Sequence, residues 1–164
     1  MLNPSSTLQK LFDAPVRPGR LVWIGLRPVR REPMLAVDEA LAETGRGLAG
    51  DRYRKLGGGR QVTLIEAESL VAVAAFLGRE AVPPEAVRRN LVTRGISLVA
   101  LKGRRFRIGL AVLETSGECH PCSRMEEILG AGGYNAMRGR GGITARVLEG
   151  GPLRLGDAVE RIDS

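Results

Sequence analysis

The chain has 164 residues, 43% of them hydrophobic, which suits a single domain whose core needs no disulfides or structural metal. Its formal net charge of +7 indicates an anionic partner, such as a phosphate-bearing cofactor, an acidic protein surface or nucleic acid. Aromatic residues make up only 4% of the chain, too few for the base-stacking surfaces of single-strand or RNA binders. Nucleic acid therefore ranks last among these partners.

The sequence has no targeting or membrane signal. Its first residues lack a continuous apolar segment before a cleavage site, and no later stretch approaches the roughly 18 apolar residues of a membrane span. We therefore expect a cytoplasmic protein without a membrane partner. Two cysteines are too few for a secreted disulfide scaffold, and in a reducing cytosol a close pair indicates chemistry or metal binding.

The first part of the chain is predicted to be an arm followed by a strand. Residues 1–19 mix proline and serine with a weak apolar pattern, which indicates a loosely packed arm ahead of a domain that spans residues 20–164. Residues 20–28 (RLVWIGLRP) form a short apolar run closed by proline, as is typical of a strand.

The middle of the chain contains the clearest helix signal. The segment from Gly59 begins as a strand, and apolar residues then recur at helical spacing, which predicts a helix near residues 66–77 that stops at Gly78. Residues 82–98 begin with a proline-initiated turn and continue into a β-branched stretch that is expected to be a strand.

The last third is predicted to be mostly strands. Residues 105–117 alternate arginine with apolar residues and then become apolar, which predicts one strand entering the core. Residues 122–129 suit one or two helical turns after Pro121. Residues 141–151 and 152–162 are expected to form two strands divided by a Gly-Gly-Pro turn.

Together these elements predict a mainly β fold. Many short strands, 22 glycines, 9 prolines and few helices are typical of a β-barrel or sandwich with small helical insertions. Neither a repeated strand-helix alternation nor an internal repeat is visible, so one domain is expected.

Residues 115–130 (TSGECHPCSRMEEILG) hold both cysteines and the only histidine. Cys119 and Cys122 offer half of a tetrahedral zinc site, but no second pair follows, so only a dimer could supply four thiolates. The CHPC spacing also suits a redox pair ahead of a helix, although such pairs usually sit early in alternating strand-helix folds. A third interpretation is that the cysteines are small buried side chains. The polar neighbours Glu118, His120 and Arg124 favour an accessible thiol instead.

Six segments occur in a recognisable order. They are GLAGDRYR (47–54), GRQVTLIE (59–66), RRNLVTRGISL (88–98), LKGRRFRIG (101–109), CHPCSRME (119–126) and GRGGITARVLEGGPLRLGDAV (139–159). As a set they resemble the MOSC domain, the family named for the C-terminal domain of molybdenum cofactor sulfurases, over about residues 21–159. The resemblance implies a distorted β-barrel of MOSC type with a few short helices and a small-molecule pocket.

The resemblance also implies a chemistry. A family cysteine is proposed to carry sulfur as a persulfide, and it matches Cys122, whereas Cys119 is an extra thiol that leaves a relay or resolving role open. The implied sulfur donor is a separate pyridoxal-phosphate-dependent cysteine desulfurase, because this chain has no desulfurase segment with a Schiff-base lysine. Pyridoxal phosphate is therefore expected on that partner and not on this chain. The implied acceptor is a metal-sulfur centre, often the molybdenum cofactor.

Arginines are expected to support this chemistry. They raise thiolate character nearby and bind phosphate through bidentate hydrogen bonds, although each one alone also suits a solvated surface. Glycines let a backbone approach a ligand and supply amide donors. Asp51 is expected either to orient an arginine or, as the favoured alternative, to cap a turn. The candidate cofactor-binding residues are Arg60, Arg88, Arg89, Asn90, Arg94, Arg138, Arg140, Gly141, Gly142 and Asp51.

Three functions are compatible with the sequence. The leading hypothesis is a sulfur carrier with catalytic Cys122, assisted by Cys119, that delivers sulfur to a molybdenum cofactor or another metal-sulfur centre. In the second, Cys122 is a molybdenum ligand in a reductase of N-hydroxylated compounds, as some relatives are thought to be. The third is a basic module that binds nucleic acid.

Overall fold

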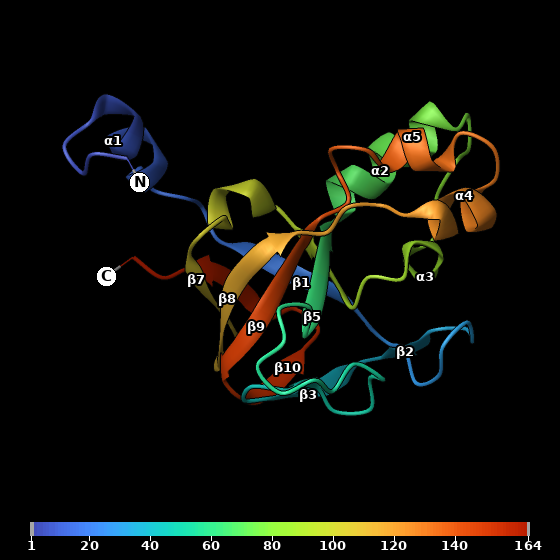
Figure 1. Ribbon diagram of the computed structural model, residues 1–164, viewed down its shortest axis with the longest axis horizontal. Helices are drawn as coiled ribbons and strands as arrows, with labels where there is room; N and C mark the ends of the chain where they lie inside the picture. Colours follow the sequence, from blue (N-terminus) through green and yellow to red (C-terminus); the bar gives the residue numbers. More distant parts are fainter. Residues whose placement is uncertain (1, 164) are drawn as a thin grey trace.

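A computed structural model describes residues 2–163 and shows a mainly β fold built around a barrel (Figure 1). The barrel strands follow the order β1-β6-β5-β9-β8-β7-β11, and β11 pairs back with β1 to close the ring. Only β5 and β6 pair in parallel, so the barrel is mixed. The barrel strands are β1 (Gly19–Leu26), β5 (Val62–Glu66), β6 (Leu91–Arg94), β7 (Arg105–Ile108), β8 (Ala111–Glu118), β9 (Ile143–Glu149) and β11 (Ala158–Arg161). The expected fold class is confirmed.

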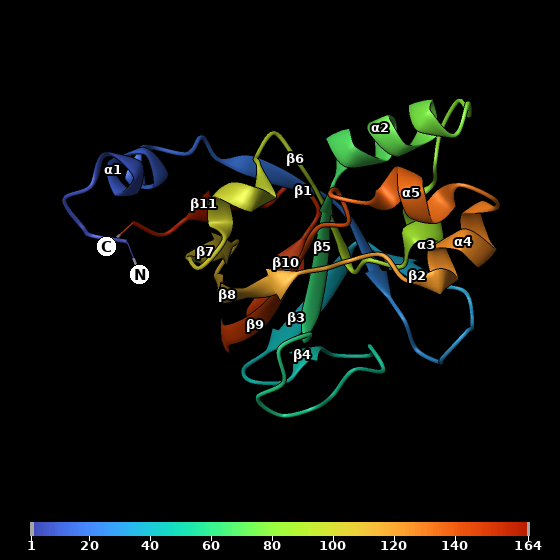
Figure 2. The same ribbon diagram turned by 45° about the horizontal axis from the view of Figure 1, so that its top comes forward.

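A second, smaller sheet lies across one end of the barrel (Figure 2). Its order is β10-β3-β4, with β3 at Glu39–Glu43, β4 at Gly47–Leu48 and β10 at Gly151–Arg154. One further strand, β2 (Leu35–Val37), extends the main sheet beside β1. Strands β2, β3 and β4 had no sequence signal, because they are only two to five residues long and show little apolar alternation.

Two segments that were each expected to form one strand form two. The segment 105–117 turns at Gly109 and Leu110, where Gly109 adopts φ +58°, so β7 and β8 are an antiparallel hairpin. The segment 152–162 breaks between Arg154 and Ala158. In addition, β10 pairs with β3 and not with β9, so the turn at Gly150 leads the chain from the barrel into the smaller sheet.

The helices are short and gather mainly on one side of the barrel, at the upper right of Figure 1. The helices there are α2 (Ala67–Phe76), α3 (Pro84–Val87), α4 (Ser123–Leu129) and α5 (Gly133–Met137). The helices expected near residues 66–77 and after Pro121 are thus confirmed. A 3-10 helix, η1 (Leu98–Leu101), follows β6. In the segment 1–19, the helix α1 (Thr7–Asp13) buries none of its residues.

The parallel strands β5 and β6 contribute residues to two separate apolar clusters. Leu64 of β5 and Leu91 of β6 point into the barrel core, whereas the next residues, Ile65 and Val92, pack under the helices. This alternation follows from the two-residue period of a strand. The strands therefore connect the barrel to the helical layer, and the loops at that junction carry the candidate site residues.

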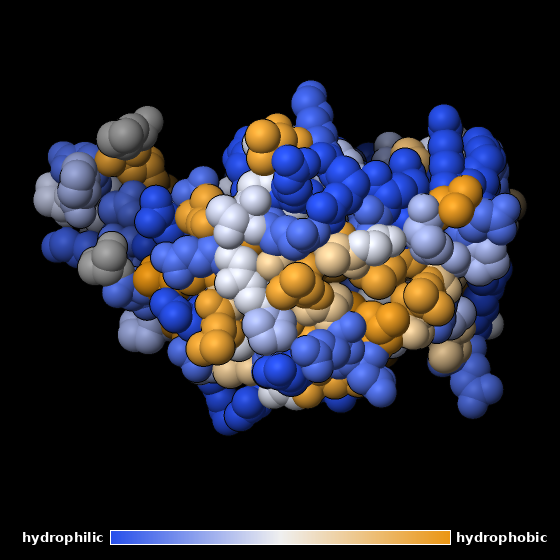
Figure 3. Space-filling view, turned by 90° about the horizontal axis from the view of Figure 1, so that it is seen from below, coloured by the Kyte–Doolittle hydropathy of each residue, from blue (hydrophilic) through white to orange (hydrophobic). Residues whose placement is uncertain are grey.

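The outer surface mixes charged and apolar residues. Seen from below, the face of the molecule has apolar residues grouped near its centre and hydrophilic residues around them (Figure 3). Within residues 2–163, none of the helices has the length and apolar character required to cross a membrane.

Candidate functional site

The two cysteines occupy different environments. Cys119 directly follows β8, donates its backbone N–H to the Gly142 carbonyl at 2.8 Å, and is only 1% exposed. Cys122 directly precedes α4 and is exposed, and both thiols are free. Of the two candidate catalytic cysteines, Cys122 is thus the one that an external molecule can reach.

The segment between the cysteines is extended. It contains neither a turn nor a bend, and Cys122 has φ −129° and ψ −179°. A fully extended chain advances about 3.3–3.6 Å per residue, so the two Cα atoms lie at most roughly 10 Å apart. Neither thiol is in a disulfide, and a redox role for the pair stays a prediction. In residues 2–163, no set of three or more His, Cys, Asp or Glu side chains is arranged to hold a metal ion.

Arg89 ties the site loops together. Its guanidinium donates to the carbonyl oxygens of Gly141 at 2.8 Å, Val87 at 2.9 Å and Cys119 at 3.2 Å. The residue is 7% exposed, and burial lowers the pKa of its guanidinium. Among the described residues it forms no ion pair with a carboxylate. A buried positive charge therefore lies next to the Cys119 loop, and its hydrogen bonds go to carbonyl oxygens.

Gly141 and Gly142 allow two backbones to approach closely. A Cβ atom on Gly141 would lie 2.1 Å from the Cys119 carbonyl oxygen, and one on Gly142 would lie 1.8 Å from the Leu64 carbonyl oxygen. Gly142 also has φ +93°, which side-chain-bearing residues rarely adopt. The close approach observed at these glycines is thus to protein backbone; a ligand contact there stays a prediction.

The Gly142→Ala substitution should destabilise the protein by about 2–5 kcal/mol, because left-handed strain adds to the displacement of β5 backbone. Gly139→Ala is the matched control, since Gly139 has φ +77° but nothing within 4 Å of a Cβ. It should lose only about 1–2 kcal/mol. Urea unfolding measures both free energies, and equal losses would show that the contact with Leu64 is unimportant.

Arg60 and Arg140 also border the Cys119 loop. Arg60 Nη2 lies 3.7 Å from Cys119 Sγ, within the range of a hydrogen bond to sulfur. The Arg140 guanidinium lies over the Phe76 ring, 4.7 Å from its centroid, while its buried Nε has no hydrogen-bond partner among the described residues. Residues 117–121 and 139–143 line a pocket of about 60 Å³. Arg60 and Arg140 thus place positive charge at the Cys119 loop, and Arg140 lines this pocket.

Arg88 has the features of an incomplete anion site. It adopts φ +56° directly after α3, and its Nη1 donates to the Glu32 carbonyl oxygen at 2.8 Å. Its Nη2 is buried without a partner in the described part of the chain. Burial lowers the pKa of the Arg88 guanidinium, and the neighbouring charges of Arg124, Arg27 and Arg52 lower it further. We call Arg27, Arg52, Arg88 and Arg124 the arginine cluster.

A buried polar network fixes one member of the arginine cluster. Asp51 accepts from Arg27 Nε at 3.2 Å and from Nη2 at 3.0 Å, and the Asp51 side chain is fully buried. Asn90, also fully buried, donates to Asp51 Oδ1 at 3.2 Å and accepts from the Thr63 N–H at 3.1 Å. Asp51 also accepts from the Tyr53 N–H at 3.3 Å, so it both orients an arginine and caps a turn.

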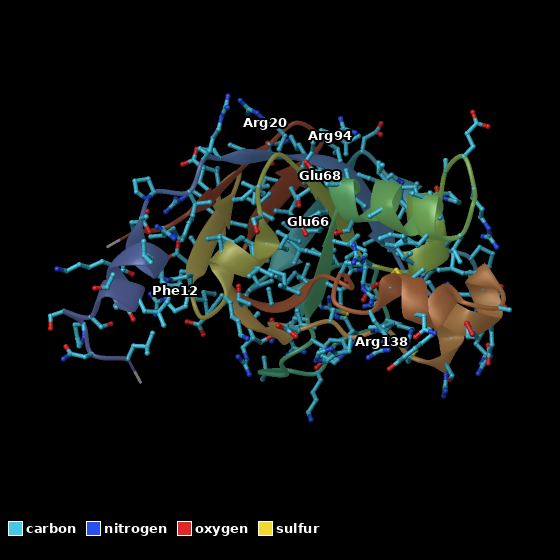
Figure 4. All side chains as sticks on the ribbon, turned by 90° about the horizontal axis from the view of Figure 1, so that it is seen from above. Phe12, Arg20, Glu66, Glu68, Arg94 and Arg138 are labelled. Carbon is cyan, nitrogen blue, oxygen red and sulfur yellow. The ribbon has the colours of Figure 1, made fainter. Side chains whose placement is uncertain are left out.

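The structure brings most of the candidate residues together. Asp51, Arg60, Arg88, Arg89, Asn90, Arg140, Gly141 and Gly142 surround the Cys119–Cys122 loop or support the residues that do. Arg138 is exposed, and its guanidinium donates to Asn135 Oδ1 at 3.4 Å. Arg94 is directly opposite Arg20 in the β1-β6 ladder, on the other side of the view from Arg138 (Figure 4).

Sequence reasoning missed Arg27 and Arg52. Arg27 directly follows β1 and is bound by Asp51 from a distant loop, and Arg52 follows Asp51 in the chain. The segment GLAGDRYR contains Arg52 but gave no reason to prefer it to other arginines. Only the Asp51 side chain, which the sequence did single out, indicated that an arginine partner existed.

The fold and the site define a small β-barrel protein with an exposed thiol next to an arginine-rich, partly buried site. A model of the MOSC domain matches residues 51–160, so the chain belongs to the MOSC domain family. A comparison with curated proteins found no match.

Solved structures share the fold. The YuaD protein of Bacillus subtilis superposes with a TM-score of 0.79 at 20% identity, covering 89% of this chain and 96% of that one. YiiM of Geobacillus stearothermophilus gives 0.71 at 17% identity, covering 88% and 75%. YiiM of Escherichia coli gives 0.69 at 22% identity, covering 88% and 70%. At these identities the likeness establishes the fold alone.

Proposed function

We propose that this MOSC protein carries sulfur as a persulfide on Cys122 and presents it to a molybdenum cofactor whose phosphate is bound by the arginine cluster. The observation that carries the proposal is the exposed Cys122 thiol next to arginines whose charge the protein leaves partly unbalanced. Only Ser123 separates Cys122 from Arg124, which is a member of that cluster.

The residues present fit a phosphate-bearing group. Arg52 and Arg88 form no ion pair within residues 2–163, and the buried Arg88 Nη2 has a free donor. A dianionic phosphate accepts several charge-assisted hydrogen bonds at once and offsets the repulsion between guanidinium groups. Arg27, held rigid by Asp51, adds a donor whose orientation is already fixed. When bound, the cofactor supplies the metal-sulfur centre.

The sulfur-loading step needs only the chain's own thiol and a persulfide donor. The Cys122 thiolate attacks the terminal sulfur of the donor persulfide, and a new S–S bond forms at Cys122. The donor's S–S bond breaks, and its inner sulfur leaves with the bonding electrons as a thiolate. Electrons balance without a further oxidant or reductant. The donor expected here is a pyridoxal-phosphate-dependent cysteine desulfurase, which requires the exposure that Cys122 has.

Arg88→Gln tests the phosphate part of the proposal. Loss of a charge-assisted hydrogen bond removes about 1.5–3 kcal/mol, so the Kd for isolated molybdenum cofactor should rise about 10–100-fold. Fluorescence titration of the purified apoprotein measures this Kd. Arg107→Gln, which removes an exposed arginine on β7, is the control and should bind as the wild type does. Equal affinities in all three proteins would remove the arginine cluster from the site.

The burial of Arg89 supports a second candidate function. A guanidinium that is 7% exposed and has no carboxylate partner is best stabilised by an anion that stays bound. A resident cofactor of this kind would have Cys122 as its molybdenum ligand, in a reductase of N-hydroxylated compounds. Purified protein would then contain molybdenum and show reductase activity that Cys122→Ser abolishes. Protein that accepts sulfur but holds no molybdenum favours the sulfur carrier.

A further inference from the structure

A second group of arginines lies on the outer face of the barrel. Arg20 on β1 and Arg94 on β6 are direct cross-strand partners, and both are exposed. Arg17 borders the same hollow, which has a volume of about 630 Å³ and is otherwise lined by Pro18, Gly19, Val22 and Gly95. In Figure 4, Arg20 and Arg94 lie together at one edge of the molecule.

The pairing of Arg20 with Arg94 is electrostatically unfavourable. Directly opposite residues have Cβ atoms about 4.5–5.5 Å apart, and like charges there destabilise the sheet. Among residues 2–163, neither these two arginines nor Arg17 forms an ion pair. Arg20 Nη1 donates to the Gly156 carbonyl oxygen at 3.2 Å. The Glu68 carboxylate lies at the edge of the hollow, where its Oε2 accepts the Gly95 N–H at 2.9 Å, but it forms no ion pair with the three arginines.

The backbone holds these three arginines around an open space. Arg17 precedes Pro18, which restricts it to extended conformations, and the other two sit on hydrogen-bonded strands. Gly19 packs tightly, since a Cβ there would lie 2.5 Å from the Arg94 carbonyl oxygen. Gly95 has φ +82°, and a Cβ there would meet only the Gly19 Cα, at 3.8 Å. No side chain therefore fills the space above Gly95.

We infer that the Arg17–Arg20–Arg94 hollow binds the phosphate group of a small phosphorylated molecule. Guanidinium groups form forked hydrogen bonds to phosphate oxygens, and a bound dianion turns the repulsion between Arg20 and Arg94 into shared attraction. None of the lining residues is acidic, and the neighbouring Glu68 carboxylate is held by the Gly95 N–H. This site is independent of the proposed function, because none of its residues belongs to the arginine cluster or to the cysteine loop.

The test uses inorganic pyrophosphate as the probe and the whole, isotope-labelled protein. Backbone amide signals of Gly19 and Gly95 should shift saturably as pyrophosphate is added, and sodium chloride at the same ionic strength should not shift them. In Arg20→Gln/Arg94→Gln the response should disappear. Arg107→Gln and Arg88→Gln should retain it, the latter because it alters only the site near the thiols.

Two results would overturn the inference. One is a pair of Gly19 and Gly95 signals that pyrophosphate leaves unchanged or that sodium chloride shifts equally. The other is a response that survives in Arg20→Gln/Arg94→Gln. A stability measurement adds a separate check: in anion-free buffer, Arg94→Gln should raise the melting temperature by about 1–3 °C, because it removes the like-charge pair. A fall in melting temperature would contradict that charge repulsion.

Discussion

Cys122→Ser should abolish the gain of one sulfur atom that the wild-type protein shows after incubation with a cysteine desulfurase and cysteine. The reason is that the nucleophile must reach a donor persulfide, and Cys122 is the exposed thiol of the two. Intact mass spectrometry under non-reducing conditions measures the gain directly. The expected loss is complete, since a serine hydroxyl is not nucleophilic enough toward persulfide sulfur.

Cys119→Ser is the matched control for this experiment. Cys119 is 1% exposed and forms no disulfide with Cys122, so its replacement should leave the sulfur gain close to that of the wild type. If Cys122→Ser still gains sulfur at full yield, Cys122 is not the carrier. If instead both variants lose the gain, Cys119 acts in loading, and the loop must rearrange during the reaction.

Asp51→Ala should destabilise the protein by about 3–5 kcal/mol, because it leaves the largely buried Arg27 guanidinium without its carboxylate partner. The Asp51 side chain is fully buried and the Arg27 side chain is 12% exposed, so water screens the remaining charge poorly. Asn90 loses an acceptor in the same substitution. Urea denaturation followed by circular dichroism gives the free energy of unfolding.

The double variant Asp51→Ala/Arg27→Met separates charge from packing. Removing both charges avoids the unpaired guanidinium, so at least half of the lost stability should return. The double variant should still bind molybdenum cofactor more weakly than wild type, because Arg27 belongs to the arginine cluster. If the double variant is no more stable than Asp51→Ala, the loss came from the hydrogen bonds of Asn90 and Tyr53 and not from the charge.

Local patterns in the sequence were sufficient to predict those helices and strands whose apolar residues recur with a clear period. The helix α2 and the strand β5 follow one another as expected, because the apolar spacing changes from two to about 3.6 residues near Glu66. The strand boundaries at Gly109 and Gly156 were missed, since each turn is short and interrupts a segment whose residues otherwise suit a strand. The strand β3 is stabilised by pairing with the distant β10, which no local pattern reveals, and β4 pairs in turn with β3.

The candidate site was predictable where a residue type already implies a chemistry. The thiols and the residues RRN at positions 88–90 could be selected on that basis. The burial and the contacts of these residues could not be predicted from the sequence. Exposure distinguishes Cys122 from Cys119, and it depends on how β8 pairs with β9 at the barrel rim. In the same way, Arg94 lies near Arg20 and not near Arg88, because four strand residues carry the chain from one side of the barrel to the other.

The most direct test of the account is whether the arginine cluster and Cys122 form one site. Alkylation of Cys122 by iodoacetamide can be followed by mass spectrometry with and without molybdenum cofactor, in the wild type and in Arg88→Gln. We predict that the cofactor slows alkylation of the wild type at least tenfold and has little effect on Arg88→Gln at the same concentration. Alkylation that proceeds at an unchanged rate in wild-type protein saturated with cofactor would contradict the account.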